Sequence, residues 1–331
     1  MHGLKARVQT KLSRLLLNIH SPRNYHKRDY CKIGENMRLS EIKNKISVDV
    51  IRDDRFGSLG LITYKNPDLL IYIEDAKYLP ALKDKKNISC VLTAPGLSKD
   101  IPERFGLCLS KEPKRTFYDI QNYLVKETNF YWKPFKTRIA KSAKINSTAF
   151  IAKRNVRIGE RCQIGPHVSI LEGTIIENDV VIRAGCVIST EGFQMKKFGT
   201  DVMAVAHGGG VLIHDRVELQ ANCCISKSVF GGFTEIGEDS KFDNMVHIAH
   251  NVKMGKRCFA AACAMIAGSV TIGDDVWIGP AAAITSEVDI GDKASITVGS
   301  VVSRNVAPGQ KVTGNFAIDH DRFIEFIKSI R

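Results

Sequence analysis

The sequence contains no apolar run of the roughly 18 to 20 residues that a membrane-spanning helix needs, so we expect no transmembrane segment. Its apolar stretch near the start, LLLNI, is too short for the core of a secretion signal, and no small-residue cleavage site follows it. The nine cysteines include no C-x-x-C pair, so their spacing gives no sign of a redox motif or a paired-cysteine metal site. These absences predict a cytoplasmic protein.

Acidic residues are in deficit, with 35 against 48 lysines and arginines, which gives a net charge of +13. Residues 1–36 form a basic N-terminal extension with eight basic and two acidic residues. Residues 4–19 have the pattern of a basic amphipathic helix, which we expect to dock on the protein's own surface or on a partner; peripheral membrane contact through residues 1–30 is the alternative. No nucleic-acid-binding module is recognisable, so the charge favours an acidic carrier protein or an anionic membrane face as partner; a solvated basic surface without a partner is the alternative.

An apolar residue recurs at every sixth position through the second half of the chain. The run consists of Ile236, Phe242, Ile248, Met254, Ala260, Ile266, Ile272, Ile278, Ile284, Ile290, Ile296 and Val302. A period of six fits neither a helix, with 3.6 residues per turn, nor a strand, with a period of two. We therefore predict a mainly β protein in which residues 132–306 form a left-handed parallel β-helix, with three short strands in each coil.

Small or β-branched residues occupy most positions two before the recurring aliphatic residue, such as Val252, Ala264, Val270 and Val276. Four cysteines are among them, and we expect these to pack as small apolar side chains: Cys162, Cys186, Cys223 and Cys258. Glycine directly follows the aliphatic residue at 237, 255, 273, 279 and 291, where we expect it to relieve the corner of the coil.

The rest of the chain divides around this coil. Residues 37–131 alternate helix-like and strand-like patterns and predict a small α/β domain. Interruptions of the period at about 190–210 and 226–235 predict loops that leave the coil, and the first is long enough to be functional. Residues 307–331 predict a C-terminal loop and a short amphipathic helix, which we expect to cap the open end of the coil.

The segment FDNMVHIAHNVKMG, residues 242–255, places two histidines inside the repeat. His250 lies two residues after the inward Ile248, so it points outward near a corner. Gly268 lies one coil further, at about 4.8 Å, and Asp243 lies on the adjoining face. An imidazole with an ordinary pKa near 6.5 suits a general base, a carboxylate can orient it, and a glycine N–H can meet a developing oxyanion. This combination is suited to acyl transfer.

The same segment resembles the signature of the UDP-3-O-(3-hydroxyacyl)glucosamine N-acyltransferases of lipid A synthesis, in which DN…IAHN carries the catalytic histidine. MRLSEIKNKISVDV and YIEDAKYLPAL resemble that family's nucleotide-recognition domain, and the resemblance extends over about residues 37–306. It implies that His250 is the base, Asp243 its partner and Gly268 the oxyanion donor, and that the enzyme is a homotrimer. His247 and Asn251 are candidate substrate contacts.

Two motifs depart from the family pattern. The nucleotide pocket reads YIEDAKY instead of F-x-x-N-P-K-Y, so Tyr72 and Tyr78 remain candidates for holding the base while Asp75 replaces an asparagine. A carboxylate cannot donate the hydrogen bond that an amide can. Glu287 stands where a substrate-site histidine is expected. The acyl group is expected to arrive as an acyl-carrier protein or coenzyme A thioester, with no bound cofactor and no metal.

Two other functions remain open on the sequence alone. The coil is also used by non-catalytic scaffolds, in which His250 would have no chemical role. A zinc β-helix carbonic anhydrase requires three histidine ligands, two of them spaced H-x-x-x-x-H. His247 and His250 are too close for that spacing, so the set would need His207 and His214.

Overall fold

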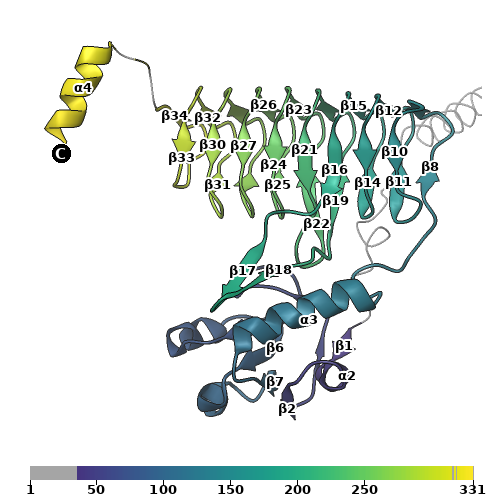
Figure 1. Cartoon of the computed structure of the whole chain (residues 1–331), viewed down its shortest axis with the longest axis vertical. Helices are drawn as coiled ribbons and strands as arrows, with labels where there is room; N and C mark the ends of the chain where they lie inside the picture. The colour runs from purple at the N-terminus through teal and green to yellow at the C-terminus, as the bar shows by residue number, and fades with distance from the viewer. Residues whose placement is uncertain (1–35, 315–316, 318, 331) are drawn as a thin grey trace, which may run out of the picture.

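The structure, a computed structural model, describes residues 36–314, 317 and 319–330. The expected helix at residues 4–19 lies outside this range, and so does the membrane contact expected through residues 1–30. Figure 1 shows a long three-sided coil, a smaller α/β part beneath its middle, and one helix apart from both. Within the described residues no helix combines the length and apolarity needed to cross a bilayer.

The coil is a left-handed parallel β-helix, as predicted, and its strands form three parallel sheets, here called faces A, B and C. Face A consists of β10 (Phe150–Ile151), β13 (Ser169–Ile170), β16 (Val187–Thr190), β21 (Cys224–Ser226), β24 (His247–Ile248), β27 (Met265–Ile266), β30 (Ala283–Ile284) and β33 (Val301–Val302). Face B consists of β8 (Arg138–Ile139), β11 (Val156–Ile158), β14 (Thr174–Ile176), β19 (Gly210–Ile213), β22 (Phe233–Ile236), β25 (Lys253–Met254), β28 (Thr271–Ile272) and β31 (Asp289–Ile290).

Face C consists of β9 (Lys144–Ile145), β12 (Gln163–Ile164), β15 (Val181–Ile182), β20 (Glu218–Leu219), β23 (Lys241–Phe242), β26 (Phe259–Ala260), β29 (Trp277–Ile278), β32 (Ser295–Ile296) and β34 (Lys311–Val312). The chain runs from face B to face C to face A and back to B. The coil therefore continues to β34, a few residues beyond the predicted limit of 306.

The period of six fixes the core of the coil. All twelve recurring residues from Ile236 to Val302 are buried, and each pairs with its equivalent in a neighbouring coil, as Ile248 does with Ile266. The four cysteines expected inside the coil are buried there and join the same apolar cluster. Each coil thus stacks its aliphatic side chains on those of its neighbours, which is where the burial free energy of the coil comes from.

The corners are four-residue turns whose third residue adopts a left-handed backbone. Nine such residues recur from Met245 to Lys293, with φ between 53° and 63°. The corner glycines are not among them. A Cβ on Gly237 would overlap the carbonyl oxygen of Gly255, and one on Gly255 would overlap that of Gly273. These glycines relieve the corner by making room for the next coil and not by adopting a left-handed conformation.

The α/β part is built on a five-stranded sheet in the order β2–β7–β6–β5–β4. Its strands are β2 (Asp49–Arg52), β4 (Ser58–Leu59), β5 (Leu69–Ile73), β6 (Ile88–Thr93) and β7 (Gly106–Leu109), with β1 (Met37–Arg38) and β3 (Arg55–Phe56) forming a separate pair. The helices are α2 (Leu39–Lys43), α3 (Pro113–Glu127) and two 3₁₀ segments, η2 (Ala76–Leu82) and η3 (Pro95–Asp100). Helix α3 packs against β5 and β6.

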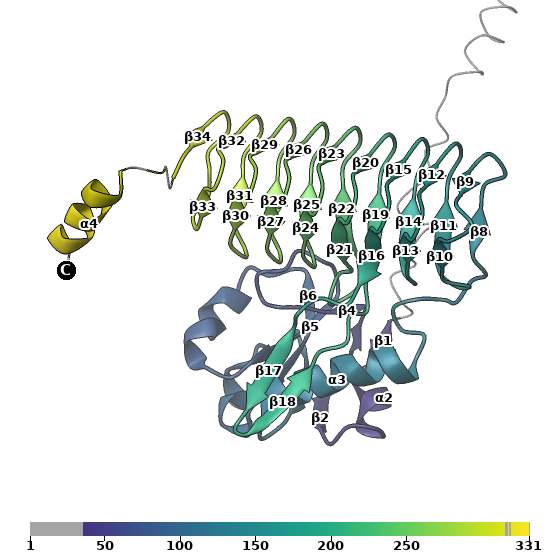
Figure 2. The same ribbon diagram turned by 45° about the horizontal axis from the view of Figure 1, so that its top comes forward.

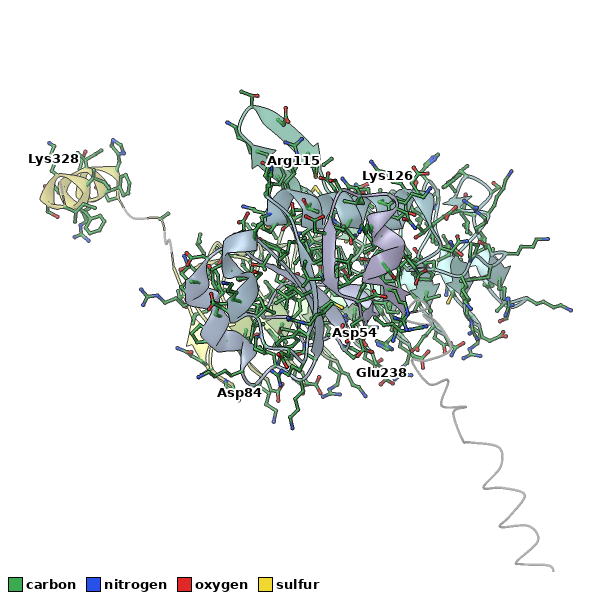
Figure 3. All side chains as sticks on the ribbon, turned by 90° about the horizontal axis from the view of Figure 1, so that it is seen from below. Asp54, Asp84, Arg115, Lys126, Glu238 and Lys328 are labelled. Carbon is green, nitrogen blue, oxygen red and sulfur yellow. The ribbon has the colours of Figure 1, made fainter. Side chains whose placement is uncertain are left out.

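Two loops connect this part to the coil. One is residues 191–209, which carry the hairpin of β17 (Met195–Phe198) and β18 (Asp201–Ala204), and the other is residues 227–232. Gln121 on α3 donates to the carbonyl oxygens of Ala206 and Val229, one in each loop, at 2.9 and 2.8 Å. Arg115, labelled in Figure 3 beside the hairpin, pairs with Asp201 at 3.1 Å. Both predicted loops exist, and helix α3 holds them.

The C-terminal helix does not cap the coil, so that expectation is wrong. Helix α4 (His320–Ser329) has no buried residue and stands apart from the coil in Figures 1 and 2, and its Lys328 is remote from the other labelled side chains in Figure 3. The end of the coil is closed by its own last turn. Val306 is buried there and pairs with Ile290, and Pro308 lies against Gly291.

A column of alternating charges runs along the edge of face B next to its corner with face C. The two ring nitrogens of His214 lie 2.9 Å from carboxylate oxygens of Glu177 and Glu235, and Lys253 pairs with Glu235 at 3.2 Å. Carboxylates accept hydrogen bonds, so both ring nitrogens of His214 must carry protons. Burial by itself would lower the pKa of His214, but the bonds and charges of the two glutamates raise it to about 9.

We predict that His214 makes folding stability fall with pH between about 6.5 and 9. Its pKa is higher in the folded than in the unfolded protein, so its contribution is complete below pH 6.5 and is lost as pH rises through about 9. The loss is on the order of 3 kcal/mol. Urea unfolding at both ends of this range measures it, with His214→Gln as the comparator that keeps hydrogen bonding without charge. A wild-type pH dependence no steeper than that of the variant would contradict the prediction.

Candidate active site

His250 lies in the turn at residues 249–252, at the corner between faces A and B. Both loops that leave the coil do so at this corner, after β16 and β21 of face A. The ring points outward and is partly buried by these loops, not by the interior of the coil. The structure thus confirms the predicted outward direction of His250 and surrounds it with loop residues that the period of six does not describe.

Asn251 holds the His250 ring. The Asn251 Oδ1 atom lies 3.0 Å from His250 Nδ1 and accepts the Val229 N–H at 3.1 Å, while Asn251 Nδ2 donates to Ser228 Oγ at 2.8 Å. The backbone of Asn251 has φ of 63°, a left-handed conformation that asparagine tolerates better than most side chains. One residue therefore shapes the corner and fixes the imidazole to the 227–232 loop.

These contacts determine which nitrogen of His250 carries the proton. The Ser228 hydroxyl donates to the carbonyl oxygen of Gly231 at 2.8 Å, so its oxygen accepts from the Asn251 amide. The amide oxygen then faces both the Val229 N–H and His250 Nδ1, and an oxygen acceptor requires a proton on Nδ1. In the neutral ring Nε2 is therefore unprotonated and carries a lone pair. A general base needs such a nitrogen to accept a proton.

The protonation state of His250 agrees with this arrangement. Burial lowers the pKa of the His250 imidazole below its ordinary value of 6.5, and the nearby Lys196 ammonium lowers it further, while the bond to Asn251 acts in the opposite direction. A lowered pKa leaves the ring neutral at pH 7. His250 is thus poised to accept a proton at Nε2.

Gly268 lies directly under the imidazole, one coil further. A Cβ there would overlap His250 Cε1 and come within 2.8 Å of Nε2, so the missing side chain makes room for the ring. At equivalent turn positions a side chain of the next coil accepts the free N–H, as Asp274 does for Lys256 at 2.8 Å. Within the described residues the Gly268 N–H has no such acceptor. It is available to a ligand beside His250.

The loop at residues 191–209 adds a second histidine against the first. The rings of His207 and His250 meet edge to face, with centroids 5.6 Å apart, and Gly192 lies between them, where a Cβ would be 2.8 Å from His207 Nε2. His207 Nδ1 contacts the Val205 carbonyl at 3.0 Å, and its Nε2 accepts the Gly192 N–H at 3.2 Å. His207 is fully engaged and supports the His250 ring from one side.

Glu191 ties the two ends of this loop together and links them to the 227–232 loop. It accepts the His207 N–H at 3.0 Å and pairs with Lys227 at 2.8 Å. Burial by itself would raise the pKa of Glu191, but the His207 ring, whose Nδ1 lies 2.9 Å from a Glu191 oxygen, and the charge of Lys227 lower it to about 2. The period of six does not include Glu191, His207 or Lys227. The signal that marks them is the placement of polar residues where the loops begin and end: Glu191 and His207 at the two ends of the long loop, and Lys227 at the start of the second.

Asp243 does not lie beside His250 within one chain, contrary to expectation. It begins the turn at residues 243–246, at the corner between faces C and A, whereas His250 is at the corner between faces A and B. The two residues therefore flank face A at its opposite edges. The Asp243 carboxylate accepts from the Asn244 backbone N–H at 2.7 Å, and the His250 ring donates from Nδ1 to Asn251 Oδ1 instead.

The three predicted nucleotide contacts do come together. Tyr72, Asp75 and Tyr78 line one cleft of about 610 Å³, together with Lys77, Lys114 and the coil residue Glu287. The Glu287 N–H donates to the Gly268 carbonyl at 3.1 Å, so the cleft opens beside the corner that carries His250. Tyr64 of the α/β part also contacts this corner, through Ser269 Oγ at 3.3 Å.

Residues of this cleft differ in how free they are to bind a ligand. Tyr78 is 47 % exposed, whereas Tyr72 is half-buried against Phe117, with ring centroids 5.0 Å apart. The Asp75 carboxylate caps η2 through the Lys77 N–H at 2.9 Å and pairs with Lys77 Nζ at 2.8 Å. Asp75 therefore shapes its own loop, and Tyr78 offers the accessible aromatic surface.

The remaining histidines lie elsewhere. His247 projects from face A on β24, and burial lowers the pKa of its imidazole. His214 lies between two carboxylates at the corner of faces B and C, away from His250 and His207. In the described part of the chain no group of three or more histidine, cysteine or acidic side chains is arranged to hold a metal ion. The geometry therefore gives no support to the zinc alternative.

Comparison with known proteins identifies the repeat and several relatives. The model for bacterial transferase hexapeptide (six repeats) matches residues 155–190, and the model for the hexapeptide repeat of succinyl-transferase matches residues 269–304. UDP-3-O-acylglucosamine N-acyltransferase 2 of Legionella pneumophila is 32% identical over 91% of this chain and 96% of its own length. The Helicobacter pylori UDP-3-O-acylglucosamine N-acyltransferase is 28% identical over 71% and 76%.

Some matches are more local. For the UDP-3-O-acylglucosamine N-acyltransferase of a Caulobacter strain, 39% identity extends over 31% of this chain and spans 30% of that relative's length. Among solved structures, UDP-N-acetylglucosamine acyltransferase from Campylobacter jejuni matches 59% of this chain and 81% of its own, at 20% identity and a TM-score of 0.45.

We predict that His250 is in the Nδ1–H form and titrates below its ordinary pKa of 6.5. Nitrogen chemical shifts of labelled histidine measure both properties. Asn251→Ala removes the acceptor and should lower the pKa further, while Asn251→Asp places a carboxylate beside the ring and should raise it. A wild-type pKa above 6.5, or shifts of the same sign in both variants, would overturn the assignment.

Proposed function

The chain belongs to the UDP-3-O-acylglucosamine N-acyltransferase family, and on this premise we propose that it transfers an acyl group from a thioester to the amine of a nucleotide-activated amino sugar, in lipid A or surface-glycan synthesis. The observation that carries the proposal is a neutral imidazole with a free Nε2 lying directly over a glycine whose N–H has no acceptor in the described chain. Proton removal and oxyanion stabilisation are the two aids that aminolysis of a thioester requires.

The reaction assigns one role to each group. His250 Nε2 takes a proton from the acceptor amine as its nitrogen attacks the thioester carbonyl carbon, and the Gly268 N–H meets the negative charge on the carbonyl oxygen. The carbon–sulfur bond then breaks, and the leaving thiolate takes the proton from the imidazolium. The products are the amide and the free thiol. Asn251 keeps the ring in the required tautomer throughout, and His207 supports it.

The cleft of the α/β part provides the nucleotide site in this proposal. Tyr78 presents an exposed aromatic face to the base, Tyr72 adds a phenol, and Lys77 and Lys114 supply positive charge for phosphates. Acyl-carrier protein or coenzyme A delivers the acyl group as a co-substrate, and no resident cofactor takes part. We place the enzyme in the cytoplasm, where both kinds of thioester are made.

We further propose that three copies assemble through face A. Its outward side chains carry no charged Lys, Arg, Asp or Glu over eight strands and include the exposed Phe150, Met265 and Val301 at 57, 40 and 63 %. The full outward set is Phe150, Ser169, Val187, Cys224, His247, Met265, Ala283 and Val301. Faces B and C carry outward charges such as Glu235 and Lys241. A long uncharged face with exposed apolar residues is typical of a subunit interface.

This assembly restores a role to Asp243. When three prisms turn their faces A toward one threefold axis, the A–B edge of each meets the C–A edge of the next. His250 and Asp243 lie at these two edges of the same coil, so His250 of one protomer faces Asp243 of its neighbour. The carboxylate then stabilises the imidazolium that forms during the reaction.

The function is tested with a panel of UDP- and dTDP-linked amino sugars and of acyl-carrier and acyl-CoA donors, with the acylated product detected by mass. We expect His250→Ala to lower kcat by about 10²-fold or more, because positioned acid–base catalysis contributes that much. Its circular dichroism and oligomeric state should match the wild type, since the side chain is outside the core. Retained turnover in a correctly folded variant would rule out His250 as the base and favour the scaffold alternative.

Mixing two inactive variants tests the shared site. Asp243→Ala and His250→Ala should each lose activity, and unfolding and refolding them together should recover part of it. In a mixed trimer the interface between an intact His250 and an intact Asp243 is complete. A mixture as inactive as its components, under conditions where tagged protomers are shown to exchange, would contradict an active site between protomers.

A further inference from the structure

The first coils carry a concentration of positive charge that the catalytic corner does not use. Residues 133–161 contain nine lysines and arginines and a single acidic residue, Glu160. The remainder of the coil, residues 162–312, has twelve basic and sixteen acidic residues. The coil is therefore strongly positive at its N-terminal end and weakly negative along the rest.

The basic side chains surround this end of the coil. Arg138 projects from face B, Lys141 lies at the corner of faces B and C, Lys144 projects from face C, and Lys153 lies at the corner of faces A and B. All four are exposed, and within the described residues none has a carboxylate at ion-pair distance. Arg161, one coil further, does have one, Asp179 at 2.6 Å.

Among the described residues, nothing covers this end of the coil. Strands β8, β9 and β10 are each the last strand of their sheets, and in Figures 1 and 2 no described element stacks beyond them. Ile139 is 42 % exposed there, and Ile145 and Ile151 of the same first coil are only partly buried. Figure 3 shows nitrogen-tipped side chains extending from this teal end of the coil. The end thus combines a rim of cations with exposed apolar side chains.

We propose that this basic rim, defined by Arg138, Lys141, Lys144 and Lys153, docks the protein on an anionic phospholipid surface. Each lysine or arginine close to such a surface is attracted by its negative potential, and apolar side chains among them enter the headgroup region. The cations are spread over several sides of one end, which suits contact with a plane. A binding site for a small acidic protein would instead be expected to gather its cations on one face of the coil.

The proposed trimer strengthens this contact. Three parallel coils present three rims at the same level, and simultaneous engagement of linked sites multiplies a weak affinity. If the proposed function holds, docking brings the enzyme to its substrate, because an acceptor and product that carry acyl chains partition into the same bilayer. The docking itself does not depend on the reaction and is tested without it.

The test uses the full chain with sedimenting vesicles of neutral phosphatidylcholine and of phosphatidylcholine with phosphatidylglycerol. The rim variant R138Q/K141Q/K144Q/K153Q is compared with a matched variant of equal charge loss at the other end, K293Q/R304Q/K311Q/K328Q. We expect the wild type to bind only the anionic vesicles and to be released by salt. The rim variant should lose roughly tenfold or more in partition coefficient. The matched variant should lose less than about twofold.

Three further readings decide the interpretation. Light scattering must show both variants in the wild-type oligomeric state, because charged residues on edge strands also prevent self-association. If the quadruple rim variant does not fold, the double variants R138Q/K141Q and K144Q/K153Q are measured in its place. An equal loss of vesicle partitioning in the rim and matched variants would mean that only the net charge of the protein matters, and it would overturn the proposal. Vesicle binding that survives in the rim variant, with turnover lost only on acyl-carrier donors, would assign the rim to the carrier protein and also overturn it.

Discussion

The stacking of one buried aliphatic residue on its equivalent in the next coil is the constraint on which the rest of the molecule depends. It fixes the height of every coil at one strand spacing and the direction of every outward position. Ile248 on Ile266 therefore places His250 over Gly268 without any direct bond between them. The chemistry of the corner is a consequence of the regularity of the core beneath it.

The loops supply what regularity cannot. A bare corner of the coil would leave His250 in solvent, with a rotating ring and an ordinary pKa. The loops at 191–209 and 227–232 bury it partly, set its tautomer through Asn251 and place His207 against it. Gln121 and Ser58 of the α/β part bond to these loops in turn, with Ser58 Oγ donating to the Phe230 carbonyl at 2.7 Å. The cleft of the α/β part and the corner that carries His250 are thus parts of one hydrogen-bonded body.

What the sequence could predict follows the same division. The coil, its core, the outward direction of His250 and the rung that carries Gly268 follow from counting in sixes, because the geometry repeats. The positions of Glu191, His207 and Lys227 do not, because loop conformation depends on contacts with distant residues such as Gln121. The prediction that Asp243 lies beside His250 within one chain was wrong. Counting in sixes places both residues in the same coil, but they lie at opposite edges of face A. Helix α4 shows the same limit, because an amphipathic pattern does not say what its apolar face will meet.

Asn251 meets three requirements with one side chain: a left-handed backbone, an oxygen that serves two donors, and a nitrogen that serves Ser228. Glycine would satisfy the first alone, and glutamine would reach too far for the others. Position 251 is therefore a point of very low mutational tolerance within a repeat whose other turn positions accept methionine, arginine, cysteine or alanine. Most turn positions of the coil can vary in sequence, but position 251 is constrained because the same residue sets the backbone of its turn and orients the His250 ring.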